Sequence, residues 1–287
     1  MNTVGGRTNG TASQAVLVTG CSSGIGRATA LALVQAGLPT WASARRMDTI
    51  VELETAGCRV IELDVTDEES RQRAVQEIAT EHGAVAALVN NAGYAQAGPV
   101  EEVSLASFRR QFETNVFGLV RMSQLVLPGM RAQQHGTIVN ISSAAGLIGV
   151  PGTGAYAMSK WAVEAFSDAL RYETRSFGVR VVALEPGGVL TTNFAATEAA
   201  SWPATRGPYE GFRDSHLRQM ARWTSEGARG GMSTPEQVAR RVVTAITARR
   251  PRARYKIGIA PRLMPLMYRT LPSRLWDGLW ARQFPMN

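Results

Sequence analysis

Short runs of apolar residues alternate along most of the chain with longer segments in which apolar residues recur every three or four positions. The short runs are apolar on both faces and rich in β-branched residues, as strands buried in a parallel sheet are. They cover residues 15–19, 38–44, 59–63, 85–90, 136–142, 179–185 and 255–259. The periodic segments predict helices at residues 25–36, 50–56, 67–81, 105–131, 154–177 and 235–249.

This alternation predicts an α/β protein with a doubly wound parallel sheet of about seven strands, a Rossmann-type fold, over residues 15–260. Two of the expected helices begin with capping signals. Thr66 precedes three acidic residues, and Thr234 precedes Pro235 and a glutamate. Neither a repeat nor an interdomain linker interrupts the pattern, so we expect a single domain.

Three segments fall outside this pattern. Residues 1–14 are polar and Gly-rich, without the features of a signal sequence, and predict a disordered lead-in. Residues 191–233, here called the insertion, follow the sixth strand and mix aromatic with polar residues. They predict a lid at the carboxyl edge of the sheet, where ligands bind in such folds. Residues 261–287, here called the basic tail, predict an amphipathic extension.

Composition excludes several classes of protein. The chain has 287 residues, of which 45% are hydrophobic, enough for a large core. No run of about 18 apolar residues predicts a membrane-spanning helix. Cys21 and Cys58 are too few for a disulfide framework, and the three histidines are scattered, so we expect no metal site. A reducing cytoplasm is the expected location.

The net charge of +8 is confined to one end of the chain. From Arg249 onward there are nine basic residues and one acid, which leaves 22 of each sign in residues 1–248. An electrically neutral body argues against general nucleic-acid binding and for a local basic feature.

A glycine-rich loop joins the first strand to the first helix. Gly20, Gly24 and Gly26 permit a tight turn and the close approach of a pyrophosphate to the helix N-terminus. We expect the whole loop to contact a dinucleotide, through Gly20, Ser22, Ser23, Gly24, Ile25 and Gly26.

The end of the second strand predicts which dinucleotide is bound. An acid there would bind the ribose 2′-hydroxyl of NAD, whereas arginine accommodates the 2′-phosphate of NADP. The chain has Ser43-Ala44-Arg45-Arg46 at this point. Arg45 is therefore the expected 2′-phosphate contact, supported by Arg46 and Ser43. The alternative is a pair of solvated loop arginines.

Tyr156 and Lys160 lie four residues apart in a predicted helix, and Ser143 precedes the tyrosine by thirteen residues. Residues four apart share a helix face, so the ammonium would lower the tyrosine pKa and favour the phenolate. The pair predicts a general acid and base acting at a carbonyl or alcohol oxygen. Taken alone, the pair would equally suit a surface tyrosine beside a solvated lysine.

Together these motifs resemble the short-chain dehydrogenase/reductase family over residues 14–258. Besides the glycine loop, the residues that carry the resemblance are Asp64, Val65, Asn90, Asn91, Ala92, Gly93, Asn115, Ser143, Tyr156, Lys160, Pro186, Gly187 and Thr191. The extended branch of the family and the bacterial enoyl reductases have different motif spacing. The second strand end and the basic tail look like the hydroxysteroid- and retinol-dehydrogenase branch.

The resemblance implies a role for each position. Ser143, Tyr156 and Lys160 would be the catalytic residues, with Lys160 also holding the nicotinamide ribose. Asn115 would hold a water that relays protons. Asp64 and Val65 would contact the adenine, and Asn91, Ala92 and Gly93 would lie beside the cofactor. The nicotinamide would be contacted by Pro186, Gly187, Val189 and Thr191.

Some positions have a plain structural alternative. Ser142 rather than Ser143 could face the substrate, although the spacing favours Ser143. Asn115 could be a buried asparagine that binds a backbone carbonyl, and Asn90 could satisfy backbone groups at a strand end. Cys21 is expected to be a packing residue rather than a redox switch.

Substrate preference is predicted from the insertion and the loop after Ser143. The side chains of Leu147, Ile148, Val150, Met158, Phe194 and Trp202 would form a mostly apolar pocket. We therefore expect a lipophilic ketone, aldehyde or alcohol as the substrate.

The basic tail has two apolar stripes flanked by arginines, at residues 262–269 and 274–282. One interpretation is a pair of short helices packed on the core beside the substrate cleft. The second is a helix lying on a membrane surface. The third is a docking patch for an acidic carrier protein or a CoA-linked substrate. Pro265 and Gly278 are expected to interrupt both stripes.

The sequence as a whole predicts an NADPH-dependent oxidoreductase of the lipophilic carbonyl/alcohol type. The alternatives are a 3-ketoacyl-ACP/CoA reductase and a catalytically idle NADP-binding regulator. By resemblance the chain would be a homodimer, with Trp161, Ala165 and Tyr172 in the contact. These three residues could equally belong to the core of one chain.

Overall fold

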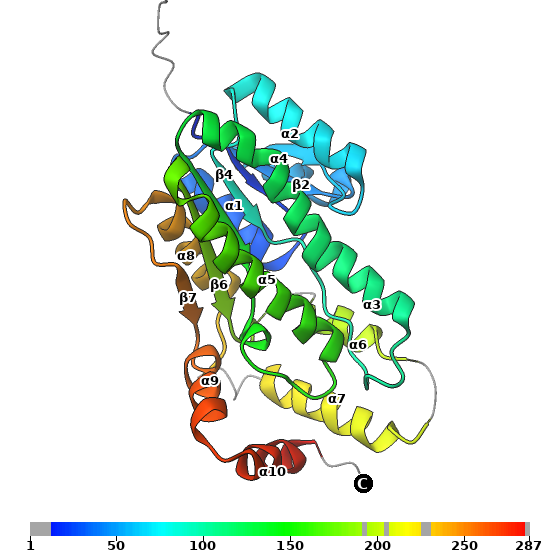
Figure 1. Cartoon of the computed structure of the whole chain (residues 1–287). Helices are drawn as coiled ribbons and strands as arrows, with labels where there is room; N and C mark the ends of the chain where they lie inside the picture. Colours follow the sequence, from blue (N-terminus) through cyan, green and yellow to red (C-terminus); the bar gives the residue numbers. More distant parts are fainter. Residues whose placement is uncertain (1–12, 191–193, 204–206, 225–230, 285–287) are drawn as a thin grey trace, which may run out of the picture.

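The computed structural model describes residues 13–190, 194–203, 207–224 and 231–284. Seven parallel strands form one sheet in the order β3-β2-β1-β4-β5-β6-β7 (Figure 1). The strands are β1 (Val16–Val18), β2 (Thr40–Ala44), β3 (Arg59–Glu62), β4 (Ala87–Asn90), β5 (Gly136–Ile141), β6 (Val179–Pro186) and β7 (Arg254–Ile257). The predicted doubly wound parallel sheet is confirmed.

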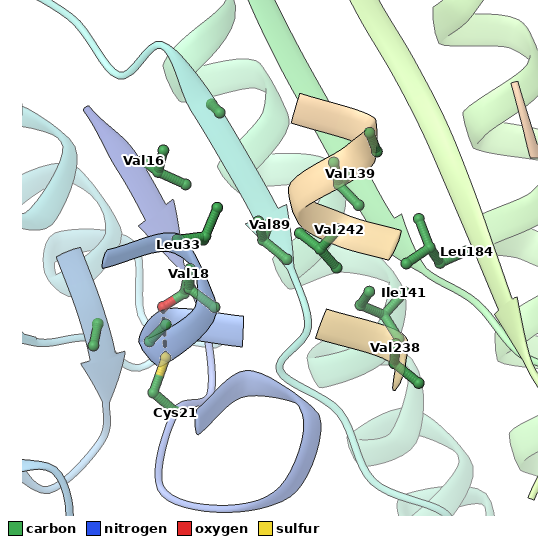
Figure 2. Close-up of a cluster of buried hydrophobic side chains, with 14 of the residues drawn as sticks. Val16, Val18, Cys21, Leu33, Val89, Val139, Ile141, Leu184, Val238 and Val242 are labelled. Carbon is green, nitrogen blue, oxygen red and sulfur yellow. Dashed lines mark hydrogen bonds between the residues drawn. The ribbon is translucent and has the colours of Figure 1, made fainter. Parts of the chain in front are cut away.

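Helices cover both faces of the sheet. On one face, α1 (Gly24–Gln35) and α8 (Pro235–Thr247) pack on strand side chains (Figure 2). On the other face, the core includes residues from α2 (Glu68–His82), α4 (Leu119–Ala132) and α5 (Gly154–Glu173). Since both faces are buried, the strands show the continuous apolar pattern found in the sequence.

The order of strands changes direction between β1 and β4. Val16, Leu17 and Val18 pair with β2 on one side and with β4 on the other. In parallel sheets of this kind, ligands bind outside the carboxyl ends of the strands at such a switch point. The glycine loop and the Asn91-Ala92-Gly93 motif therefore meet at this edge of the sheet.

The two capping signals differ in outcome. Thr234 accepts from the backbone N–H of Gln237, and the Gln237 side chain binds back to the Thr234 backbone, which completes a capping box at the start of α8. At α2 the capping residue is Asp67, one position after Thr66, and its carboxylate accepts from the backbone N–H of Ser70 at 2.7 Å. Asp and Thr are both good N-cap residues, so the motif predicted where α2 begins but not which of the two residues caps it.

Two predicted helices differ from the structure. Residues 50–56 do not form a helix of that length but contain one short 3₁₀ turn, Val51–Leu53, and a second such turn, Met47–Thr49, precedes them. The helix expected over residues 105–131 comprises α3 (Leu105–Phe112), a π-helical turn (Glu113–Gly118) and α4. The π turn contains Asn115, and such turns are frequent at functional sites.

The insertion and the tail are largely helical where the structure describes them. The insertion contains α6 (Phe194–Ala200) and α7 (Glu210–Thr224), and the tail forms α9 (Ala260–Thr270) and α10 (Ser273–Gln283). Pro265 lies inside α9 and Gly278 inside α10, so the expectation that they interrupt these helices is wrong. Figure 1 shows α9 and α10 at one end of the molecule, beyond β7.

Two further expectations concern the start of the chain and membrane-spanning helices. Residues 1–12 of the expected lead-in lie outside the described residues, whereas Ser13 donates from Oγ to the backbone oxygen of Ala84 at 2.6 Å. Among the helices of the described ranges, none is both long enough and apolar enough to span a bilayer.

Candidate active site

The glycine loop has the shape of a dinucleotide cradle. Gly20 has a φ of +72°, and a Cβ on it would lie 2.9 Å from the Cα of Ala92. A Cβ on Gly26 would lie 2.2 Å from the backbone oxygen of Gly20. Ser23 starts α1 without a side-chain cap, and the first turn of α1 carries no acid. The backbone N–H groups of this first turn therefore face the loop, where they could donate hydrogen bonds to a pyrophosphate.

Residues after β4 hold this loop in position. Thr19 Oγ1 accepts from the backbone N–H groups of Asn91 at 3.0 Å and Ala92 at 2.9 Å. The Asn91 side chain donates to the backbone oxygens of Thr19 at 2.8 Å and Gly20 at 3.0 Å. The chain therefore brings the predicted cofactor residues of both loops together.

The two arginines after β2 are exposed. Arg46 lies 3.7 Å from Asp48, an acid that the sequence reasoning did not consider. Arg45 is close enough to Tyr94, the residue after Gly93, to affect its pKa, although burial dominates and raises that pKa. Ser43 is fully buried and donates to the backbone oxygen of Val18 at 3.0 Å, so its expected support of Arg45 is wrong.

The remaining nucleotide residues lie at neighbouring strand ends. The Asp64 carboxylate accepts from the backbone and side chain of Thr66, and Val65 is buried against Gly118. Pro186 ends β6, the Gly187 N–H donates to Ile257 O at 2.9 Å, and Val189 is bridged to Ser233. Thr191 lies outside the described residues.

Ser143, Tyr156 and Lys160 converge in front of the carboxyl end of β5. Ser143 follows this strand, and α5 presents Tyr156 and Lys160 on one face, because residues four apart align. The Lys160 ammonium donates to the backbone oxygen of Ile141 at 2.7 Å and lies 5.7 Å from the centre of the Tyr156 ring. Ser142, the alternative serine, is buried.

Burial controls the protonation of this pair. It raises the pKa of Tyr156, and a hydrogen bond from Ser143 opposes part of the rise. Burial also lowers the pKa of Lys160 to about 8, while the Glu164 carboxylate acts in the opposite direction. The expected lowering of the Tyr156 pKa is therefore not found, because desolvation of the phenolate outweighs the favourable contacts.

Asn115 is buried in the π turn and satisfied by protein groups. Its Oδ1 accepts from the Tyr94 N–H at 3.1 Å, and its Nδ2 donates to Tyr94 O at 3.0 Å and Ser159 Oγ at 3.1 Å. Gln111, one turn earlier, donates to Tyr94 O and accepts from the Gln96 N–H. The two amides position the loop after Gly93. Sequence reasoning missed Gln111, whose four-residue spacing from Asn115 was the available signal.

A buried ionic cluster lies behind Lys160. Glu164, one turn further along α5, pairs with Arg254 of β7, which also binds Glu185 at 2.8 Å and Asp168 at 2.6 Å. Glu185 is fully buried and Glu164 is 6% exposed. Burial raises the pKa of Glu164, opposed by its contacts with Ser142 and Arg254. Sequence reasoning missed this cluster, since its residues come from three elements.

Cys21 fits its structural interpretation, whereas the side chain of Asn90 binds other side chains and not the backbone groups that were expected. Burial raises the pKa of Cys21 to about 12, which leaves its thiol protonated and inert. Figure 2 shows its sulfur directed to the backbone oxygen of Val18, at 3.3 Å. The Asn90 side chain donates to Asn140 Oδ1 at 2.9 Å and to Ser123 Oγ at 3.2 Å, within the buried layer between sheet and helices.

An open, mostly apolar groove of about 700 Å³ lies between the loop before α5, α5 itself and α10. Its lining includes two of the predicted substrate residues, Val150 and Met158, with Trp161 of α5 and Trp276 and Trp280 of α10. Ser143 and Tyr156 are not part of this lining, so the groove does not form the immediate surroundings of the reacting atoms.

The other predicted substrate residues are distributed differently. The Phe194 ring packs against the Tyr156 ring at 5.4 Å between centroids. Leu147 is partly exposed, whereas Ile148 is buried. Trp202, expected in the pocket, is buried in an aromatic cluster with Phe212 and His216 of α7. Trp202 therefore packs against α7 within the insertion and does not line the groove.

The sequence model of the short chain dehydrogenases matches residues 14–202. The chain belongs to this family. It is therefore an oxidoreductase of the type that works on small molecules with a nicotinamide cofactor. The match covers the glycine loop, Ser143, Tyr156 and Lys160, the same residues that the fold gathers at one edge of the sheet.

Relatives along nearly the full length include an uncharacterized oxidoreductase, YbbO, from Escherichia coli K12. It is 35% identical, over 92% of this chain and 93% of its own. A 3-ketodihydrosphingosine reductase from Bacteroides thetaiotaomicron is 34% identical, over 85% of this chain and 88% of the relative. An NADPH-dependent 3-dehydrocapnine reductase from Ornithobacterium rhinotracheale is 32% identical, over 93% and 95%.

Solved structures of the family have the same fold. A short-chain dehydrogenase from Streptomyces avermitilis matches with a TM-score of 0.78 and 31% identity, over 95% of this chain and 97% of its own. A serine dehydrogenase complexed with NADP⁺ matches with a TM-score of 0.74 and 29% identity, over 85% and 94%.

Proposed function

We propose that the protein is an NADP(H)-dependent oxidoreductase that interconverts a ketone or aldehyde and an alcohol on a lipophilic substrate. The observation that carries the proposal is the convergence of Ser143, Tyr156 and Lys160 beside a loop shaped for a dinucleotide. When bound, the nicotinamide supplies or accepts the hydride. The protein supplies position and a proton.

Tyr156 is the general acid in the reductive direction. Its raised pKa keeps the phenol protonated at neutral pH, ready to give a proton to the substrate oxygen. Ser143 donates a hydrogen bond to that oxygen and stabilises the negative charge that develops on it. Lys160, charged below its pKa of about 8, stabilises the phenolate that remains. Asn115 positions the loop that carries Tyr94.

NADP(H) rather than NAD(H) is proposed from the end of β2. Two exposed arginines follow this strand directly, and a guanidinium suits a phosphate better than a hydroxyl. One relative is named NADPH-dependent, and one structural neighbour holds NADP⁺. Arg45 is the proposed phosphate contact, since Arg46 has Asp48 beside it.

A lipophilic substrate is proposed from the groove, whose lining contains three tryptophans, a methionine and a valine among its side chains. Relatives named for reactions on 3-ketodihydrosphingosine and on 3-dehydrocapnine support a reduction of this kind. We further propose a homodimer through α5, since Trp161, Ala165 and Tyr172 are exposed rather than part of the core of one chain.

The first test is a fluorescence titration of NADPH against NADH with the wild type and Arg45→Ala. We expect NADPH to bind at least about tenfold more tightly, a difference of about 1.4 kcal/mol, and Arg45→Ala to remove the preference. Arg73→Ala, at an exposed arginine on α2, is the matched control. Equal affinities in the wild type would refute NADP preference.

The second test is Tyr156→Phe in a screen of lipophilic ketones with NADPH. Turnover should fall by about 10²–10⁴-fold while NADPH affinity is kept, because the substitution removes only the hydroxyl group that transfers the proton. Tyr172→Phe, at an exposed position on the same helix, should leave turnover unchanged. Wild-type binding without any turnover would favour a regulator over an enzyme.

A further inference from the structure

Helix α9 has an outward stripe that the fold leaves uncovered. Ile259, Leu263 and Leu266 are 55%, 49% and 59% exposed, and they recur at the spacing of one helix face. Arg262 and Arg269 flank them and are also exposed. The opposite face is packed, since Pro261 and Pro265 are buried.

Helix α10 has the same two-sided character. Its inner side carries the buried Trp276, and Trp280 and Phe284 pack with Phe212 of α7. Its outer side carries Leu275 and Leu279, 60% and 38% exposed. Arg274 and Arg282 lie beside them. The interpretation of the tail as helices packed on the protein therefore explains only one side of each helix.

The charge of the outer side has one sign. Arg262, Arg269, Arg274 and Arg282 are exposed, and among the described residues of the tail only Asp277 is acidic. Within the described part of the chain, Arg269, Arg274 and Arg282 have no acid within ion-pair distance. Leucines bordered by arginines are typical of helices that lie in the interface of a bilayer.

We propose that the outward stripes of α9 and α10 bind the surface of an anionic lipid bilayer. The leucines enter the boundary of the acyl chains, and the arginines bind the phosphate groups around them. This goes beyond the proposed enzymatic function and does not depend on it. The continuity of both helices through Pro265 and Gly278 provides the regular faces that such binding needs.

A second copy of the chain fits this surface less well. An isologous contact would place each arginine against arginines of the same stripe, because a two-fold axis brings a patch onto itself. Such like-charge contacts are unfavourable, whereas the headgroups of anionic lipids carry the complementary charge.

Membrane binding would also bear on substrate access. The groove of about 700 Å³ has Trp276 and Trp280 of α10 in its lining, whereas Leu275 and Leu279 of the same helix are exposed. A bilayer bound to the outer side would lie one helix diameter, about 10 Å, from the groove. A lipophilic substrate could then reach the groove without crossing bulk water. This consequence, unlike the binding itself, rests on the proposed function.

The test is co-sedimentation of the full-length protein with vesicles of phosphatidylcholine alone and of an equimolar mixture with phosphatidylglycerol. We expect binding to the anionic vesicles only. Leu263→Ser/Leu266→Ser should weaken it by on the order of tenfold through lost apolar contact. Arg269→Gln/Arg274→Gln should weaken it by about 25-fold, since each arginine near an anionic surface contributes about fivefold.

Matched controls are Val51→Ser and Arg73→Gln, at exposed positions on other parts of the molecule. Both should bind as the wild type does, and thermal unfolding of every variant confirms that it is folded. Wild-type binding that the tail variants do not change would overturn the proposal, as would no binding to anionic vesicles. Leucine variants that only dissociate an oligomer, measured by light scattering, would assign the face to self-association instead. None of these outcomes affects NADPH binding, so the enzymatic proposal is tested separately.

Discussion

At the scale of single residues, burial dominates the chemistry of the active site. The sequence placed an ammonium near a phenol, from which electrostatics alone predicts a lowered tyrosine pKa. The structure buries both groups, and desolvation acts against the charged form of each. Lys160 is 7% exposed and Glu164 is 6% exposed, so the charge on Glu164 becomes the chief local support for a charged Lys160.

We predict that Glu164→Gln moves the alkaline limb of the pH profile of reduction to lower pH, by about one unit. Reduction needs Lys160 charged, and its pKa of about 8 falls further once the carboxylate is removed. The groups that face Glu164 are Lys160 and Asp168 of α5, Glu185 of β6 and Arg254 of β7. After the substitution Arg254 keeps Glu185 and Asp168, so the fold should persist.

The matched control is Glu173→Gln, at the exposed end of the same helix, which should leave the profile unchanged. An alkaline limb that stays in place or moves to higher pH in Glu164→Gln would show that Glu164 does not support the charge of Lys160.

A second prediction concerns stability. The pKa of Lys160 in the folded protein, about 8, lies below its ordinary value of 10.5. Below pH 8 the lysine is charged in the folded and in the unfolded protein, and the folded protein bears the whole free-energy cost of desolvating the ammonium. Between pH 8 and 10.5 the folded protein loses the proton first, so the cost declines to zero. The free energy of unfolding of Lys160→Met minus that of the wild type should therefore be larger at pH 7 than above pH 10.5, by about 3 kcal/mol.

Urea denaturation of both proteins at several pH values measures this difference. Leu263→Met, at an exposed site, should give a difference that does not vary with pH. A gain that is constant with pH in Lys160→Met would contradict a lowered lysine pKa.

At the scale of elements, regular structure persists through residues that usually interrupt it. Pro265 occupies the interior of α9, and Gly278 the interior of α10. In contrast, the apolar period over residues 105–131 is continuous, yet the helix changes to a π turn at Glu113–Gly118. Tertiary contacts account for that turn, because Gly118 packs against Val65 and the Asn115 side chain holds the loop at Tyr94.

Glycine-to-alanine substitutions test whether local helix propensity or tertiary contacts determine the stability of an element. Among the described residues, no atom outside its own helix lies within 4 Å of a Cβ built on Gly278, so Gly278→Ala should stabilise α10 by about 0.8–1 kcal/mol. Slower hydrogen exchange in residues 273–283 would show it. Gly26→Ala is the contrasting variant, since its Cβ would meet the backbone oxygen of Gly20, and it should destabilise the protein and its dinucleotide site. Faster exchange in Gly278→Ala would mean that the glycine is required there.

At the scale of the whole molecule, the tail and the insertion form one aromatic assembly. The Phe284 ring stacks on His216 of α7 at 5.5 Å, and Trp280 stacks on Phe284 at 5.8 Å. His216 in turn lies 3.4 Å from Glu198 of α6, in a buried pair. Phe284 lies 68 residues after His216 and 86 after Glu198, so segments far apart in sequence hold one another here.

We predict that Trp280→Ala increases hydrogen exchange in α7 by about tenfold, equivalent to about 1.4 kcal/mol of local stability. The strands of the sheet should keep their protection, since they do not contact this ring. Phe117→Ala, at an exposed aromatic residue outside this assembly, is the matched control and should leave α7 unchanged. Unchanged exchange in α7 of Trp280→Ala would show that the tail does not hold the insertion.

The sequence alone determined the sheet, the order of its elements and the three residues, Ser143, Tyr156 and Lys160, that meet in front of β5. Apolar periodicity defines buried strands and helix faces, and glycines and a four-residue spacing have local geometric meaning. Only the tertiary structure decided the protonation of Tyr156 and Lys160, the ionic cluster at Arg254, the place of Trp202 and the two-sided character of the tail. These depend on burial and on contacts between distant segments, and no local pattern encodes how far a side chain is removed from water.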